Sequence, residues 1–145
     1  MDAHAQRATA PSVLVVDDNA DIRETVRMTL EDEGYRVLEA EDGQEALRQL
    51  RDSATPLIVL LDHIMPGVDG MKTLDIVAAD PMLARRNAYI MLTADGRTGA
   101  VELISAGTDW TVPVLAKPFD LEDLLAAVAH AQDSLIGASC VQTGE

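Results

Sequence analysis

Five short aliphatic runs, separated by longer segments with helical periodicity, constrain the fold of this chain more than any other feature. The runs occupy residues 13–16, 36–40, 57–61, 88–92 and 112–116. Three of them are apolar without polar alternation, which is typical of strands buried on both faces of a parallel sheet. Such a sheet needs helices on both of its faces. The pattern therefore predicts an α/β fold.

The segments between the runs supply the helices. Apolar residues recur at helical spacing over residues 22–30, 46–50, 71–77 and 121–135. Asp120 is a suitable N-cap for the last of these helices. A further helix is expected around 98–106, although Gly99 is a poor helix former. Because parallel crossovers are right-handed, this (βα)5 order predicts a doubly wound five-stranded parallel sheet with its ligand site at the carboxyl ends of the strands.

Length and composition favour a single domain. The chain has 145 residues, of which 48% are hydrophobic, and a chain of this size buries enough surface to fold without a disulfide. The only cysteine is Cys140, so an internal disulfide is excluded. We expect the domain to cover residues 11–136, with flexible tails at 1–10 and 137–145.

Charge and hydropathy narrow the partners and the location. The chain carries 25 acidic and 11 basic residues, a formal net charge of -14, so we expect neither direct nucleic-acid binding nor attraction to anionic membranes. The N-terminus lacks an apolar signal core, and the longest aliphatic run, 57–61, is far shorter than the ~18 residues of a membrane span. We therefore expect a soluble, cytoplasmic protein.

Polar residues follow four of the five predicted strands. They are Asp17 and Asp18 after the first strand, Asp62 after the third, Thr93 after the fourth and Lys117 after the fifth. Each has an ordinary structural explanation, such as a helix cap or a turn residue. In a parallel sheet, however, all of them would meet at the same edge. Their combination therefore indicates a functional site.

The chemistry of this set points to phosphoryl transfer. Three converging carboxylates would repel one another. Their convergence is most simply explained by a bound divalent cation, and oxygen ligands favour Mg²⁺. Mg²⁺ commonly takes one or two carboxylates together with phosphate oxygens, which leaves Asp62 as a candidate nucleophile. Lys117 and the Thr93 hydroxyl could then contact a transferred phosphoryl group.

Four segments together carry a family resemblance. VLVVDDN, LLDHIMPGVDG, MLTA and LAKPF resemble, in this order, the receiver domain of bacterial two-component response regulators. The resemblance runs from about Val13 to Leu135. It implies a flavodoxin-like receiver topology and a domain that catalyses only the phosphorylation and dephosphorylation of its own aspartate.

The resemblance also implies a role for each matching residue. Asp62 resembles the phosphoacceptor, which receives its phosphoryl group from a phosphohistidine of a sensor histidine kinase or a histidine phosphotransfer protein. Mg²⁺ would be held by Asp17, Asp18, Asp62 and the backbone carbonyl of Ile64. Thr93 resembles the switch hydroxyl, and Lys117 resembles the lysine that contacts the phosphoryl group.

Two features depart from the family pattern on the side that usually signals to partners. The resemblance places a downstream protein on residues about 98–135, but Val114 stands where an aromatic residue is usual. The stretch between Gly107 and Lys117 is also longer than is common. Switching could therefore differ in this chain. The sequence leaves open a monomer or a phosphorylation-dependent dimer.

Two other functions compete with the phosphoacceptor. The first is a receiver-like adapter that binds partners without being phosphorylated, which Val114 and the longer stretch before Lys117 favour. The second is a phosphohydrolase with an aspartyl-phosphate intermediate, because the fold and an aspartate nucleophile could serve both purposes. The intact set of acids, Thr93 and Lys117 argues against the adapter, and the sequence supplies no cap or substrate pocket for the hydrolase.

Overall fold

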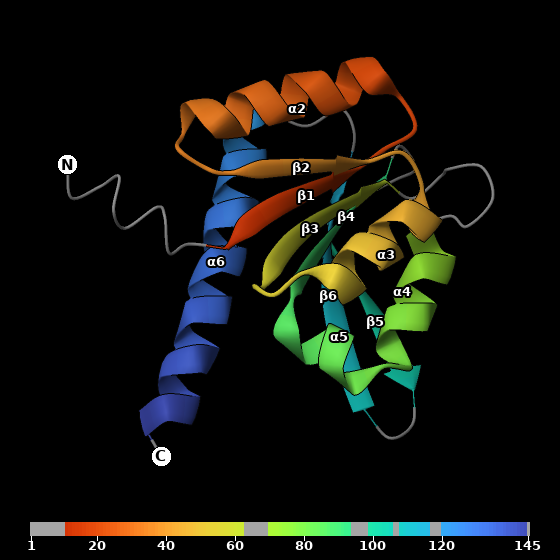
Figure 1. Cartoon of the computed structure of the whole chain (residues 1–145), viewed down its shortest axis with the longest axis vertical. Coiled ribbons are helices and arrows are strands. Elements are labelled where there is room, and N and C mark those ends of the chain that lie inside the picture. Colours follow the sequence, from red (N-terminus) through yellow and green to blue (C-terminus); the bar gives the residue numbers. More distant parts are fainter. Residues whose placement is uncertain (1–10, 63–69, 94–98, 106–107, 117–119, 145) are drawn as a thin grey trace.

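The computed structural model describes residues 11–62, 70–93, 99–105, 108–116 and 120–144. In this part of the chain, a six-stranded sheet is covered by helices on both faces (Figure 1). The strands are β1 (Ser12–Val16), β2 (Val37–Ala40), β3 (Leu57–Asp62), β4 (Ala88–Thr93), β5 (Gly99–Ser105) and β6 (Thr108–Ala116). The helices are α2 (Ala20–Asp32), α3 (Gly43–Asp52), α4 (Gly70–Ala78), α5 (Pro81–Arg86) and α6 (Leu121–Gly144).

The strand order is that of a doubly wound sheet. Across the sheet it reads β2-β1-β3-β4-β6-β5, and the first five strands in this order are parallel. Val13 at the start of β1 pairs with Val37 on one side and Ile58 on the other. The chain thus crosses from β1 outward to β2, then back past β1 to β3 and onward. This confirms the predicted five-stranded parallel sheet.

The sixth strand was not predicted. Residues 99–105 form β5, which runs antiparallel to β6 at the edge of the sheet, so the helix expected around 98–106 is wrong. Two physical reasons favour a strand here. Gly99 and the β-branched Val101 and Ile104 lower helix propensity. In addition, two residues separate β5 from β6, a spacing typical of a hairpin, so the partner strand is immediately available.

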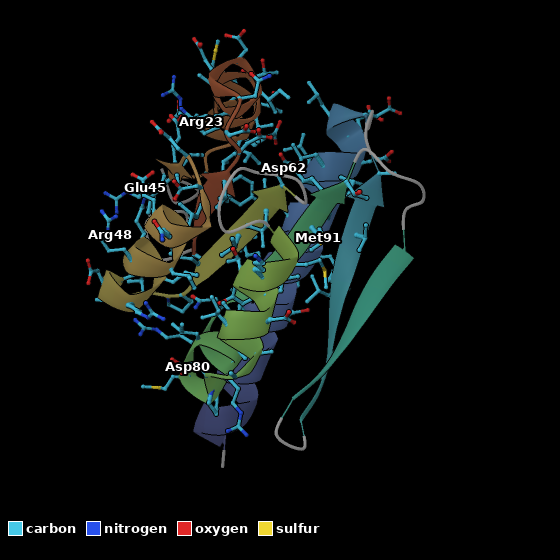
Figure 2. All side chains as sticks on the ribbon, turned by 90° about the vertical axis from the view of Figure 1, so that its right-hand side faces the viewer. Arg23, Glu45, Arg48, Asp62, Asp80 and Met91 are labelled. Atoms are coloured by element: carbon cyan, nitrogen blue, oxygen red, sulfur yellow. The ribbon has the colours of Figure 1, made fainter. Side chains whose placement is uncertain are left out.

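The hairpin also accounts for the longer stretch before Lys117. β6 has nine residues, but only Val114–Ala116 pair with β4. The preceding part of β6 pairs with β5 alone, from Pro113 opposite Ala100 to Thr108 opposite Ser105. Pro113 precedes the parallel ladder with β4 and has a partner strand on one side only, where a missing N–H is tolerated. In Figure 2 the two strands run on together as a ribbon past the rest of the sheet.

Two apolar layers separate the sheet from its helices. On one face, residues such as Leu14, Val59 and Leu61 pack with α3, α4 and α5. On the other face, residues such as Val15 and Leu60 pack with α2 and α6. Figure 1 shows this division of the helices. Because successive strand residues point to opposite faces, one apolar run supplies both layers, which explains its lack of polar alternation.

Local signals set most helix boundaries. The Asn19 side chain accepts hydrogen bonds from the backbone N–H groups of Asp21 and Ile22 and so caps α2. Gly34, at φ 95°, follows the end of that helix in a conformation that favours glycine. The short helix α5, which apolar periodicity does not predict, is capped by Asp80 and has a proline at its start.

The ends of the described chain bear on the predicted tails. Helix α6 continues to Gly144, so residues 137–144, for which a flexible tail was expected, are helical here. Residues 1–10 lie outside the described part, and the domain limits stay a prediction. Within that part, no helix combines the length and the hydropathy needed to cross a membrane.

A buried polar group joins the amino ends of two strands. The Asn87 side chain accepts a hydrogen bond from the Leu57 N–H (2.8 Å) and donates to the Leu83 carbonyl and the Tyr89 hydroxyl. The Tyr89 hydroxyl donates in turn to the Leu83 carbonyl (2.9 Å). Because Tyr89 is buried, loss of its proton would leave a charge away from water, and its pKa is raised well above the usual value.

Candidate functional site

The carboxyl ends of the central strands lie side by side, as the sequence predicts. Asp17 directly follows β1, Asp62 is the last residue of β3, and Thr93 is the last residue of β4. The parallel registers put Asp62 opposite Leu92, one residue before Thr93, and pair Thr93 with Ala116 at the end of β6. Asp17, Asp62 and Thr93 therefore share the carboxyl edge of the sheet.

Three carboxylates gather at this edge. One oxygen from each of Asp17, Asp18 and Asp62 lies within 4.8 Å of the others. Asp17 is 2% exposed and Asp62 7% exposed, whereas Asp18 is exposed to solvent. Carboxylates held this close, two of them buried, repel one another unless a cation or a proton compensates their charge. The donors are all oxygens and one side is open to water, which fits Mg²⁺ and its retained water ligands.

Three hydrogen bonds hold Asp17, two at its backbone and one at its carboxylate. Its N–H donates to the Ala40 carbonyl of β2 (3.1 Å), and its carboxylate accepts from the Asn19 N–H (2.9 Å). Its own carbonyl accepts a hydrogen bond from Nη1 of Arg23 (2.6 Å). The acidic segment after β1 is thus held by β2, by the start of α2 and by a side chain of the first turns of α2.

Arg23 belongs to a cluster of charged side chains beside this segment. Its Nε donates to Oε1 of Glu39 (3.0 Å), while Nη1 of Arg27 donates to Oε2 of the same carboxylate (2.9 Å). Glu39 lies on β2, and its backbone carbonyl accepts from the Gln49 side chain of α3 (2.8 Å). One glutamate therefore links β2 with two arginines of α2. Figure 2 shows Arg23 on α2 and Asp62 at the end of β3.

Sequence reasoning missed Arg23, Arg27 and Glu39. The two arginines are four residues apart and share a face of α2, a spacing that is visible in the sequence. Glu39 interrupts an otherwise apolar strand, which is also visible. Nothing in the sequence, however, predicts that an arginine side chain reaches the main-chain carbonyl of Asp17.

Two of the predicted site residues fall outside the described part. Ile64, expected to offer a backbone carbonyl, lies in 63–69, and Lys117 lies in 117–119. Of the predicted residues, the structure brings together Asp17, Asp18 and Asp62, and it places Thr93 at the same edge.

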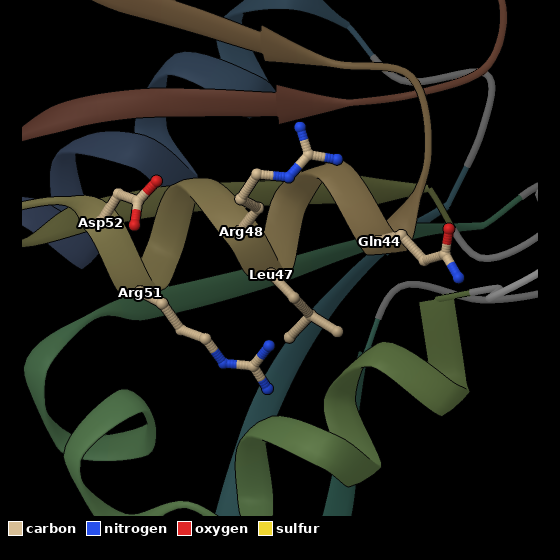
Figure 3. Close-up of a pocket in the computed structure, with 5 residues that line it drawn as sticks. All are labelled: Gln44, Leu47, Arg48, Arg51 and Asp52. Carbon is tan, nitrogen blue, oxygen red and sulfur yellow. The ribbon is translucent and has the colours of Figure 1, made fainter.

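A separate hollow occurs on the outer side of α3. It is lined by Gln44, Leu47, Arg48, Arg51 and Asp52 (Figure 3). Leu47 is buried, but the other four side chains are exposed, and none of the five is an acid of the site at the strand ends. This hollow is therefore unrelated to the acidic cluster.

Strand order and site together define a class of protein. A parallel sheet in this order, with a cluster of acids and a threonine at its carboxyl edge, is a flavodoxin-like receiver domain. Residues 13–129 match the response regulator receiver domain family. The chain belongs to this family, whose members are the receiver domains of two-component signalling systems.

Relatives of known name agree with this assignment. The chain is 39% identical over 117 residues to the transcriptional regulatory protein ResD of Bacillus subtilis, a match that covers 80% of this chain and 45% of ResD. It is 35% identical over 120 residues to the phosphate regulon transcriptional regulatory protein PhoB of Escherichia coli, covering 82% of this chain and 50% of PhoB. The chain thus spans about half the length of these relatives.

Solved structures show the same fold. A CheY-like receiver domain protein from Methanospirillum hungatei superposes with a TM-score of 0.73 at 31% identity, covering 88% of this chain and 98% of that one. The chemotaxis protein CheY4 of Vibrio cholerae superposes with a TM-score of 0.67 at 28% identity, covering 84% and 98%. Both neighbours are matched over nearly their whole length, so the predicted fold class is confirmed.

Proposed function

We propose that this domain binds Mg²⁺ and accepts a phosphoryl group on Asp62. The observation that carries the proposal is the cluster of Asp17, Asp18 and Asp62, whose carboxylate oxygens lie within 4.8 Å of one another at the carboxyl edge of the sheet. A lone buried aspartate would have a simpler structural role. Three acids at one strand edge have a clear use if a cation draws them together beside a reacting phosphoryl group.

Each residue of the site has a part in this transfer. Asp17, Asp18 and Asp62 would hold Mg²⁺, with the Ile64 carbonyl as a further ligand on the family pattern. When bound there, Mg²⁺ would supply positive charge against the phosphoryl oxygens. A carboxylate oxygen of Asp62 attacks the phosphorus, an O–P bond forms, and the N–P bond of a phosphohistidine breaks with its electron pair returning to the imidazole. Thr93 and Lys117 would contact the phosphoryl oxygens.

The donor is a sensor histidine kinase or a histidine phosphotransfer protein, and the domain would act in the cytoplasm. Phosphorylation of Asp62 would favour one of two arrangements of the domain, because Thr93 and Lys117 gain contacts to the new group. A downstream protein would read the change on residues about 98–135. That region includes the hairpin of β5 and β6 and the first part of α6.

A second function, the adapter that binds partners without phosphorylation, is favoured by one region only. The segment expected to be a helix is strand β5, and Val114 is a buried residue of β6 that packs in the core. The output side therefore differs from the predicted arrangement, whereas the acidic cluster is intact. We rank the adapter second because an adapter has no need of three converging carboxylates.

Intact-mass measurement separates the two functions. The full chain is incubated with Mg²⁺ and a small acyl-phosphate donor, and then with a phosphorylated histidine phosphotransfer protein. Wild type is compared with Asp62→Asn and with Asp75→Asn, which removes an exposed acid of α4 outside the cluster.

We expect one added phosphoryl group on wild type and on Asp75→Asn, and none on Asp62→Asn. Modification of Asp62→Asn would show that the acceptor is another residue. If both donors leave wild type unmodified, the phosphoacceptor proposal fails and the adapter replaces it.

A further inference from the structure

Two arginines of α2 bind the same glutamate, but only one of them reaches the acidic cluster. Arg23 and Arg27 each donate to one carboxylate oxygen of Glu39, at 3.0 Å and 2.9 Å. Arg23 also donates to the backbone carbonyl of Asp17, at 2.6 Å. Its side chain is 13% exposed, against 36% for Arg27. Comparing variants of the two arginines can therefore distinguish the contribution of the Glu39 contacts from that of the contact with Asp17.

The geometry of the Arg23 guanidinium restrains the backbone of Asp17. A planar guanidinium presents its N–H groups in a rigid fork, so one that binds Glu39 through Nε has Nη1 directed at a defined position. That position is the carbonyl of Asp17, whose N–H is bound to β2 and whose carboxylate accepts from Asn19. Rotation of the peptide after Asp17 would break the Arg23 contact. Arg23 therefore opposes movement of Asp17 and of Asp18, which follows it.

We infer that Arg23 is a positioning residue for the Mg²⁺ site, with Glu39 as its anchor. The inference rests on the proposed metal-binding function. It holds that Arg23 acts by geometry: the fork keeps the carboxylates of Asp17 and Asp18 where they converge with Asp62 before the ion binds. Groups that orient metal ligands in this way contribute strongly to affinity, and their loss commonly weakens metal binding by about 10–100-fold.

Charge alone predicts the opposite result, which makes the inference testable. A guanidinium near the site repels a cation, so removing only its charge would strengthen Mg²⁺ binding. Arg23→Gln removes both charge and fork. Arg23→Lys keeps the charge but has a single donor group, which cannot hold the Glu39 carboxylate and the Asp17 carbonyl in the same planar arrangement. If geometry dominates, both variants weaken Mg²⁺ binding.

The experiment is an isothermal titration of the full chain with Mg²⁺ alone. Wild type is compared with Arg23→Gln, Arg23→Lys and the matched control Arg27→Gln, which loses a bond to Glu39 but leaves Asp17 untouched. We expect Kd to rise about tenfold in both Arg23 variants and to stay within about twofold in the control. Thermal unfolding should show a larger loss for Arg23→Gln, which loses two hydrogen bonds, than for Arg27→Gln, so Kd is measured well below both midpoints.

Hydrogen exchange of the metal-free protein adds a readout that does not need the ion. The Asn19 N–H donates to the Asp17 carboxylate. Its exchange rate should be about tenfold higher than in wild type in Arg23→Gln and the same as in wild type in Arg27→Gln.

Three results would overturn the inference. They are a Kd in Arg23→Gln equal to or below that of wild type, an Arg23→Lys variant that binds like wild type, and equal weakening in Arg27→Gln. Each of these leaves the proposed Mg²⁺ site standing. If wild type itself does not bind Mg²⁺, the proposed metal function fails and the inference falls with it.

Discussion

The two sides of the sheet differ in how they are built. On the side of β2, β1 and β3, each strand is followed by a helix that packs back on the sheet, and every pairing is parallel. On the side of β6 and β5, a hairpin takes the place of one strand-helix unit, and the edge pairing is antiparallel. The first side holds the acidic cluster, and the second holds the region that would signal to partners. The carboxylates therefore lie on the side built from regular strand-helix units, whereas the departure from the predicted (βα)5 order lies on the other side.

The largest effect should come from the core of the regular side. Leu60 of β3 is fully buried between β1 and β4 and packs against α2 and α6. We expect Leu60→Ala to lower the free energy of unfolding by about 3 kcal/mol, since a leucine truncated in a tight core leaves a cavity. Urea unfolding measures the change. Leu121→Ala, at a position 44% exposed, is the control and should cost less than about 1 kcal/mol. Equal losses would mean that β3 is not central to the core.

The second effect compares backbone protection on the two sides. Strand β3 has a parallel partner on each side, whereas β5 is paired with β6 alone in the described sheet. Amides of β5 should exchange with solvent about a hundredfold faster than those of β3, because an edge hairpin can open without unfolding the domain. Backbone chemical shifts from the same spectra test the fold itself. Helical shifts over 99–105 would contradict the strand, and equal protection would remove the difference between the sides.

The third effect tests the polar group between β3 and β4. Asn87 is 6% exposed, and its side chain bonds to Leu57, Leu83 and Tyr89. Asn87→Ala leaves the buried Leu57 N–H without this acceptor, so we expect a loss of about 2 kcal/mol in unfolding free energy. Asn19→Ala, which removes a helix cap at the surface, should cost about 1 kcal/mol. The reverse order would show that water replaces Asn87 at no cost.

The smallest effect is a pH dependence at Tyr89, measured between neutral pH and pH ~11. Burial raises the pKa of its hydroxyl above the unfolded value of about 10, so the folded state holds this proton more tightly than the unfolded state does. The stabilisation from Tyr89 is therefore complete below pH ~10 and is lost as the pH rises through the window above it, by up to about 1.4 kcal/mol per pH unit. Unfolding of wild type and Tyr89→Phe is compared at neutral pH and above pH ~10. A difference between the two proteins that does not change with pH would refute this account.

Particular residues show why parts of the molecule were predictable. Asp17, Asp62 and Thr93 end three of the apolar runs, and in a parallel sheet these ends must meet, so the edge of the site follows from the order of strands. The contact of Arg23 with the Asp17 carbonyl could not be predicted, because it depends on where α2 lies relative to β2. Every residue has a backbone carbonyl, so the sequence does not indicate which one accepts a side-chain hydrogen bond.

The helix predicted around 98–106 was wrong for a different reason. Ala100, Glu102 and Leu103 are good helix formers, while Val101 and Ile104 favour strands, so local preference is balanced. Pairing with β6 selects the strand, and this partner edge is present only in the folded chain. Helix α5 is the opposite case, since Asp80 followed by Pro81 is a strong helix start that could have been read from the sequence.

An antiparallel edge strand limits how this side of the domain can move. A helix packed on a sheet can turn or slide by small amounts, because its contacts are between side chains. A strand in a hydrogen-bonded ladder has no such freedom: a shift that keeps the same side chains on the same face is two residues, about 7 Å, and a shift of one exchanges the faces. Motion of β5 against β6 is therefore all-or-none, either a whole step in register or detachment from the sheet.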